Sequence, residues 1–341
     1  MKHNQEDGVM EKSIRIAAVL LLSWVIGATA RAELPQAEVL LSDLGLSAAE
    51  VAEVKAGKIV TRAVKTTHER DLATSFAFFA PITPAELVKQ LREGLLLKVD
   101  SNTISQGKLS AAGSLEDFKG LALNPGGAAR VRRYTSKVDE ALNLSAEERA
   151  AFARLPATAP AAEVEAQLRA MLLARYQAYH AKGLAGIAPY ARDGGASRAV
   201  ADDLRVSLES LAGLKKYAPH AYAAMAGYPK AQPPGSEDRF TWVQLMAHGA
   251  PTIVLAQGLV IPDGDAFLVM QRQYYVSEGF NAEQAIAGIL PAQGGSIVIY
   301  ANHTSTDQVA GFGGGAKRSI GSKLMSSELQ GIFGKVQKKG P

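Results

Sequence analysis

The carboxy-terminal part of the chain carries the pattern that most restricts its fold. Three long segments rich in β-branched and aromatic residues, at 239–248, 252–261 and 265–277, follow one another along the sequence. The short connectors between them contain the glycine and proline that are typical of hairpin turns. This order predicts antiparallel strands, each paired with its neighbour in the sequence.

The residues that follow predict a short helix at 281–289, a fourth strand at 295–303 and one long final helix. The final helix is expected to start at Thr306 or Asp307, whose side chains suit an N-cap, and to end near Lys335. Its apolar residues form one stripe that should face a sheet. The stripe consists of Phe312, Ala316, Ile320 and Leu324, continued by Leu329, Ile332, Phe333 and Val336.

The segment before residue 114 mixes short helices with extended runs. Ser47 and Glu50 have the spacing of a capping box that opens a helix, and Thr83 is suited to cap a second one. Extended runs are expected at 58–66, 71–80 and 95–109. The sequence therefore predicts strands on both sides of the second helix.

Residues 114–228 have a different, helical character. Alanine-rich runs at 161–182 and 197–217 place apolar side chains at helical spacing. We therefore divide the chain into a signal peptide at 1–32, an amino-terminal part of the sheet domain at 33–113, a helical insertion at 114–235, and the remaining sheet with its long helix at 236–341.

The amino-terminal residues predict export. A charge-free run at 16–30 follows Lys12 and Arg15, and it ends in the small-x-small pattern that signal peptidase cuts, here after Ala32. The alternative is an uncleaved anchor, but a membrane-spanning helix needs about 20 apolar residues. The expected location of the mature chain is the periplasm or the cell exterior.

The composition excludes several classes of function. The chain has no cysteine, which removes disulfides, thiolate metal sites and cysteine nucleophiles. Its net charge of +4 is too small and too dispersed for a nucleic-acid partner. The histidines do not pair at metal-ligand spacing, so neither a metal nor a cofactor is expected.

Two motifs near the carboxy terminus invite a catalytic interpretation that the residues do not support. The glycine-rich run at 311–319 differs from a phosphate loop because Ala316 precedes Lys317, so close packing of the helix or a mobile lid explains the glycines better. His303, Ser305 and Asp307 lie close together in sequence, whereas triad members normally converge from different elements. A strand end and a helix cap explain them better, and we identify no catalytic residue.

The predicted order, with an antiparallel meander and one long carboxy-terminal helix, resembles the helix-grip fold of the START lipid-transfer domains and the birch-pollen-allergen superfamily. The run at 300–312 is similar to the strand-to-helix junction of exported bacterial proteins in this group. The resemblance implies an α+β fold, in which a curved antiparallel sheet wraps round the last helix and leaves an apolar pocket between them.

Candidate ligand-binding residues come from the strands and the start of the last helix. Alternation along 265–277 places Met270, Arg272 and Tyr274 on one face. If that face lines the pocket, Arg272 needs an acidic partner or an anionic head group, and if it faces solvent, Arg272 is an ordinary surface residue. His248 is either a pocket acid/base or a hydrogen-bonded strand end. The full set of ligand-binding candidates is Arg272, Tyr274, Met270, Trp242, Tyr300 and Phe312.

These observations favour an exported protein that binds an apolar or amphipathic small molecule, such as a lipid, between the sheet and the last helix. One alternative is an enzyme of the same fold that acts on a hydrophobic substrate. Another is an interaction protein whose helical insertion docks a membrane or envelope partner. The absence of a catalytic motif in the sequence favours binding over catalysis.

Overall fold

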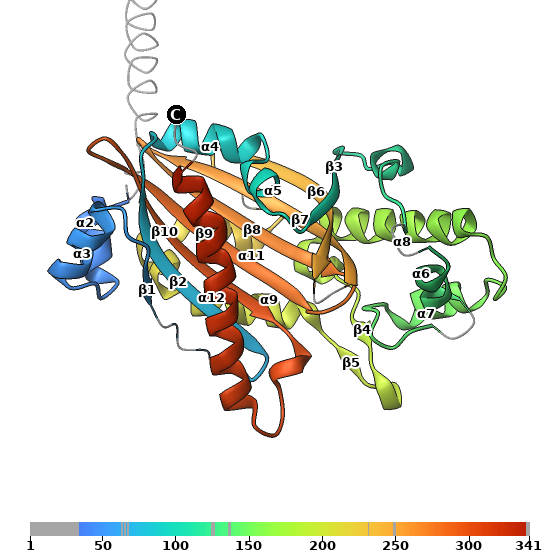
Figure 1. Ribbon diagram of the computed structural model, residues 1–341. Coiled ribbons are helices and arrows are strands. Elements are labelled where there is room, and N and C mark those ends of the chain that lie inside the picture. The colour runs from blue at the N-terminus through green and yellow to red at the C-terminus, as the bar shows by residue number, and fades with distance from the viewer. Residues whose placement is uncertain are drawn as a thin grey trace, which may run out of the picture. The chain divides into compact units, whose positions relative to one another are not determined.

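An eight-stranded antiparallel sheet, in the order β1-β2-β10-β9-β8-β7-β6-β3, forms the centre of the fold (Figure 1). The computed structural model describes residues 34–62, 64, 66, 68–123, 127–135, 138–230, 232–247 and 250–338. The predicted signal peptide at 1–32 lies outside the described residues, and so does His248. The strands are β1 (Val60–Arg62), β2 (Asp71–Ala80), β3 (Thr103–Leu109), β6 (Glu237–Ala247), β7 (Ala250–Asp263), β8 (Ala266–Val276), β9 (Ala282–Ala292) and β10 (Gly295–Ser305).

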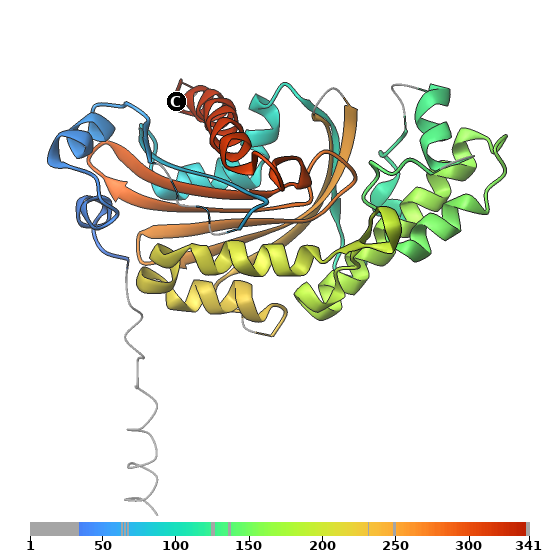
Figure 2. The same ribbon diagram turned by 90° about the horizontal axis from the view of Figure 1, so that it is seen from below.

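The helices divide between the two faces and one end of this sheet (Figure 2). The long helix α12 (Gly314–Lys338) lies on one face with α4 (Pro84–Arg92) and α5 (Leu95–Val99). The opposite face is covered by α2 (Ala37–Asp43), α3 (Ala48–Lys55), α9 (Val200–Ser210), α10 (Ala212–Tyr217) and α11 (Pro219–Gly227). At one end of the sheet lie α6 (Gly127–Tyr134), α7 (Ala146–Ala153) and α8 (Ala161–Lys182), with a small two-stranded sheet of β4 (Tyr190–Ala191) and β5 (Ser197–Arg198). In the described residues these elements are connected by 3-10 helices at η1 (Leu115–Phe118), η2 (Gly183–Gly186), η3 (Asp193–Gly195) and η4 (Asp307–Val309).

Several predictions from the sequence are confirmed. The capping box of Ser47 and Glu50 opens α3, Thr83 caps α4, and the helix predicted at 161–182 is α8. The three strands of the predicted meander are β6, β7 and β8, each paired with its neighbour. The fold is therefore α+β, with a large antiparallel sheet and a carboxy-terminal helix.

The short helix predicted at 281–289 is wrong, because these residues belong to β9. Strand β9 pairs with β8 on one side and with β10 on the other, and those strands supply backbone partners along its length. A short apolar run fits a buried strand as well as a helix, so periodicity alone could not decide between them. The extended run predicted at 95–109 is likewise wrong in its first part, which forms α5.

The predicted apolar stripe of the last helix is also corrected. Thr306 caps the 3-10 helix η4, and α12 begins only at Gly314. Phe333 is buried against the sheet, whereas Ile320 and Leu324 are 62% and 63% exposed. Leu324 and Phe333 are nine residues apart, which is about two and a half helical turns, so they point to opposite sides of α12.

Within the residues that the structure describes, no helix combines the length and the apolar composition needed to cross a membrane.

Candidate functional site

Arg272 is fully buried on the sheet face opposite α12. Among the described residues its guanidinium forms no ion pair with an acidic side chain, although its positive charge attracts the carboxylate of Asp238. Its Nε donates to Gln284 Oε1 at 3.0 Å, and its two terminal nitrogens donate to Tyr179 Oη at 3.1 Å and to the Met225 carbonyl oxygen at 3.0 Å. Met225 lies near the carboxyl end of α11, where helix carbonyls need external donors. Arg272 therefore fastens α8 and α11 to the sheet.

The other candidates do not gather into one site. Tyr274 stacks on Tyr179 with ring centroids 4.0 Å apart, and Trp242 Nε1 donates to the Asp117 carbonyl oxygen at 2.8 Å. Met270 lies on the same face of β8 as Arg272 and is buried beneath the helices that cover that face. Tyr300 lies on the other face, beneath α12, and Phe312 is fully exposed in the loop before that helix. The six ligand-binding candidates predicted from the sequence therefore lie on both faces of the sheet and in the loop before α12.

Aromatic rings occupy the contact between the second half of α12 and the sheet. The ring of Phe333 lies 4.9 Å from that of Tyr300 and 5.3 Å from those of Phe76 and Phe78, measured between centroids. Tyr300 also stacks on Phe76 at 4.9 Å. Side chains therefore fill this part of the space in which the helix-grip resemblance implies an apolar pocket.

On the same face, the part of the sheet formed by β8 and β9 is only partly covered. Phe267, Val269 and Gln273 are partly exposed on β8, and Gln271 is exposed. The strand register arranges the side chains of this face in rows that change from polar to apolar along the strands. The rows are Gln273–Glu283–Thr304, Gln271–Ala285–Asn302, Val269–Ala287–Tyr300 and Phe267–Ile289–Val298.

Glu283 is the charged residue of the first row. Its Oε1 accepts a hydrogen bond from Gln273 Nε2 at 2.8 Å, and its Oε2 accepts from Thr304 Oγ1 at 3.3 Å. Burial raises the pKa of Glu283 above its ordinary value, although hydrogen bonds from Asn302 and Thr304 oppose the shift. Among the described residues, no lysine, arginine or histidine forms an ion pair with Glu283. A carboxylate in this setting can accept hydrogen bonds from a ligand.

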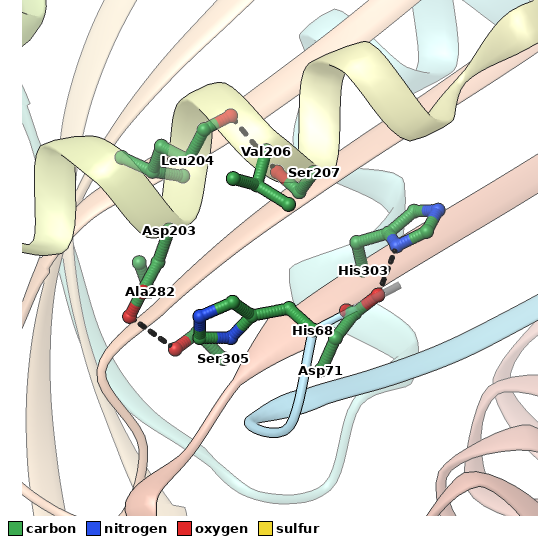
Figure 3. A pocket seen from close by; sticks show the side chains of 9 residues that line it. All are labelled: His68, Asp71, Asp203, Leu204, Val206, Ser207, Ala282, His303 and Ser305. Carbon is green, nitrogen blue, oxygen red and sulfur yellow. Dashed lines mark hydrogen bonds and ion pairs between the residues drawn. The ribbon is translucent and has the colours of Figure 1, made fainter. Parts of the chain in front are cut away.

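A small pocket lies beside α9, on the face of β10 that points away from α12 (Figure 3). His303 Nδ1 lies 2.9 Å from Asp71 Oδ2, and both side chains are buried. His303 Nε2 is buried without a hydrogen-bond partner among the described residues. The pocket has room for about one water molecule. Its lining residues are His68, Asp71, Asp203, Leu204, Val206, Ser207, Ala282, His303 and Ser305.

The three residues His303, Ser305 and Asp307 do not form a catalytic triad. The Ser305 hydroxyl donates to Asp203 Oδ2 at 2.5 Å rather than to His303. Asp307 forms ion pairs with arginines on three segments, at Arg70, Arg192 and Arg198. Asp307 thus joins the end of β10 to the loops around β2, β4 and β5.

In the described part of the chain, no group of three histidine or acidic side chains is arranged to hold a metal ion. Sequence reasoning missed Glu283, because that residue lay in a segment predicted as a helix. Its alignment with Gln273 and Thr304 depends on the pairing of β9 with both neighbours. Alternation of Glu283, Ala285 and Ala287 was the one sequence signal that pointed to a strand.

The chain was compared with known proteins in three ways. No family model matches it, and no curated protein or solved structure matches it.

Proposed function

We propose that this protein binds an amphipathic small molecule on the sheet face that carries α12, along β8 and β9. The head group of the ligand contacts Glu283, Gln273 and Gln271, and its apolar part covers Val269 and Phe267. The observation that carries this proposal is Glu283, a carboxylate without an ion-pair partner among the described residues, at the polar end of a partly exposed surface.

The chemistry of the polar end favours one class of head group. An ionised carboxylate only accepts hydrogen bonds, so the matching ligand is a cation or a neutral donor such as a hydroxyl. This differs from the anionic head group expected at Arg272, whose guanidinium is bonded to protein groups on the other face. Each ligand methylene that leaves water along the apolar rows contributes about 0.8 kcal/mol.

One further observation and one prediction from the sequence support a binding role. An antiparallel sheet with a long carboxy-terminal helix is compatible with the helix-grip resemblance, a fold that holds apolar ligands. The predicted export would place the protein in the periplasm or outside the cell. We therefore favour binding over catalysis.

Titration of the mature chain with two fluorescent amphiphiles of equal chain length tests the proposal. One probe has an amine head and the other a carboxylate head. We expect tighter binding of the amine probe, and a loss of about tenfold or more in its affinity for Glu283→Gln, since hydrogen bonds to charged groups contribute about 1.5–3 kcal/mol.

The matched control is Glu237→Gln, which neutralises a glutamate at the start of β6 whose ion-pair partners are Arg92 and Arg239. Its affinity for the amine probe should equal that of the wild type. The proposal fails if neither probe binds, or if Glu283→Gln and Glu237→Gln bind the amine probe equally well.

A further inference from the structure

The first half of α12 and the loop before it present large apolar side chains to solvent. Phe312, Ile320 and Leu324 are 102%, 62% and 63% exposed, more than any other large apolar side chain in the described part of the chain. Ile320 and Leu324 are one turn apart on the helix, and Phe312 extends from the preceding loop. We refer to these three residues with Lys317 and Lys323 as the α12 patch.

The packing of α12 keeps this patch turned outward. Gly321 rests on Leu72, and a Cβ atom added to it would lie 2.8 Å from a methyl carbon of that leucine. The next residue, Ser322, accepts a hydrogen bond at its Oγ from the Ala73 amide at 3.2 Å. Rolling the helix to bury Leu324 would break these contacts and withdraw Phe333 from its aromatic neighbours.

The α12 patch is positively charged. Lys317 and Lys323 are exposed, and helical geometry places them about 60° to either side of Ile320. Between Asp307 and Glu328 the sequence contains no acidic residue. Asp307 itself is engaged by arginines, and among the described residues neither Lys317 nor Lys323 forms an ion pair.

We propose that the α12 patch docks this protein onto an anionic phospholipid surface. Phe312, Ile320 and Leu324 enter the boundary between head groups and acyl chains, and Lys317 and Lys323 contact lipid phosphates. Interfacial helices likewise combine apolar residues that enter the membrane with lysines that contact anionic lipids. Each lysine near an anionic surface contributes about fivefold in affinity.

Charge favours a lipid surface over a second copy of the chain. A symmetric dimer places the same patch on both sides of its interface. Two patches that each carry Lys317 and Lys323 would then face each other, and like charges repel. An anionic bilayer supplies the opposite charge along the whole patch. The proposal does not depend on ligand binding at Glu283, which lies on the sheet.

Flotation of the mature chain with vesicles tests the proposal. One set of vesicles contains phosphatidylglycerol and phosphatidylcholine in equal parts, and the other contains phosphatidylcholine alone. We expect the wild type to float with the anionic vesicles at low salt and to be released at high salt. The triple variant Phe312→Ser/Ile320→Ser/Leu324→Ser should lose flotation, and Lys317→Glu/Lys323→Glu should lose it at low salt.

The matched control is Val39→Ser/Leu115→Ser, which removes apolar side chains that are 50% and 54% exposed elsewhere. It should float like the wild type, and circular dichroism should show that all variants are folded. Absence of wild-type flotation overturns the proposal, as does equal flotation of the triple variant and the control. A dimer that the triple variant abolishes, without flotation, would assign the patch to a second copy instead.

Discussion

Replacement of Arg272 by methionine distinguishes a structural anchor from a ligand contact. Methionine has a similar length and no hydrogen-bond donor, so the change leaves Gln284 Oε1 and the Met225 carbonyl oxygen without their donor from Arg272. Each buried acceptor left without a donor costs about 1–3 kcal/mol. Release of the buried guanidinium from its desolvation cost offsets part of this loss. We expect a loss of about 3 kcal/mol in the free energy of unfolding, a large fraction of the 5–15 kcal/mol typical of folded proteins.

Urea denaturation followed by tryptophan fluorescence measures this loss, because Trp242 is the only tryptophan after residue 32 and is buried in the fold. The matched control is Gln271→Met on the same strand, whose side chain is exposed on the opposite face. Its unfolding free energy should change by less than about 0.5 kcal/mol. If Arg272→Met is as stable as Gln271→Met, or more stable than the wild type, Arg272 is not an anchor and our reasoning is refuted.

Three further predictions concern other parts of the fold. Burial raises the pKa of Glu283, so the stability that this residue contributes is present below pH 4.5 and lost as the pH rises through its folded-state pKa. The melting temperature of Glu283→Gln, relative to that of the wild type, should therefore increase from acid to neutral pH. Burial opposes ionisation of Asp307, but the charges of Arg198 and Arg192 outweigh burial and lower the pKa of Asp307. Asp307→Asn should therefore lower the free energy of unfolding by about 1 kcal/mol at neutral pH, allowing for solvent screening. In acid titrations below pH 3.8, the difference in stability between this variant and the wild type should shrink. Phe333→Ala should cost about 3–5 kcal/mol in urea denaturation, whereas Ile320→Ala on the exposed side of α12 should cost less than about 0.5 kcal/mol; equal losses would contradict the assigned packing.

Local signals in the sequence predicted most elements correctly. The capping box of Ser47 and Glu50 and the N-cap at Thr83 bond backbone amides within a few residues. They therefore stabilise the start of a helix whatever that helix packs against. Alternation predicted β8, and alanine-rich helical spacing predicted α8. The predictions that failed include β9, the first part of the run at 95–109, and the start and the sheet-facing side of α12. Of these, β9 and the packing of α12 depend on partners distant in sequence.

The candidate site shows the same division. Alternation correctly placed Met270, Arg272 and Tyr274 on one face of β8 but left open which side of the sheet that face occupies. The helices that cover it come from 200–227, and only their packing decides that Arg272 is buried by protein rather than by a ligand. The position of Glu283 beside Gln273 and Thr304 likewise depends on strand register.

By itself, the sequence determined the α+β class, the antiparallel meander, the helix caps at Ser47 and Thr83, the helix at 161–182 and the expectation of export, because these depend on neighbouring residues. Only the tertiary structure decided which sheet face each side chain occupies, that Phe312, Ile320 and Leu324 point to solvent, and that Glu283 lies beside Gln273 and Thr304. The physical reason is that side-chain periodicity defines two sides of a strand or helix, and the side that becomes buried depends on elements brought together from distant parts of the chain.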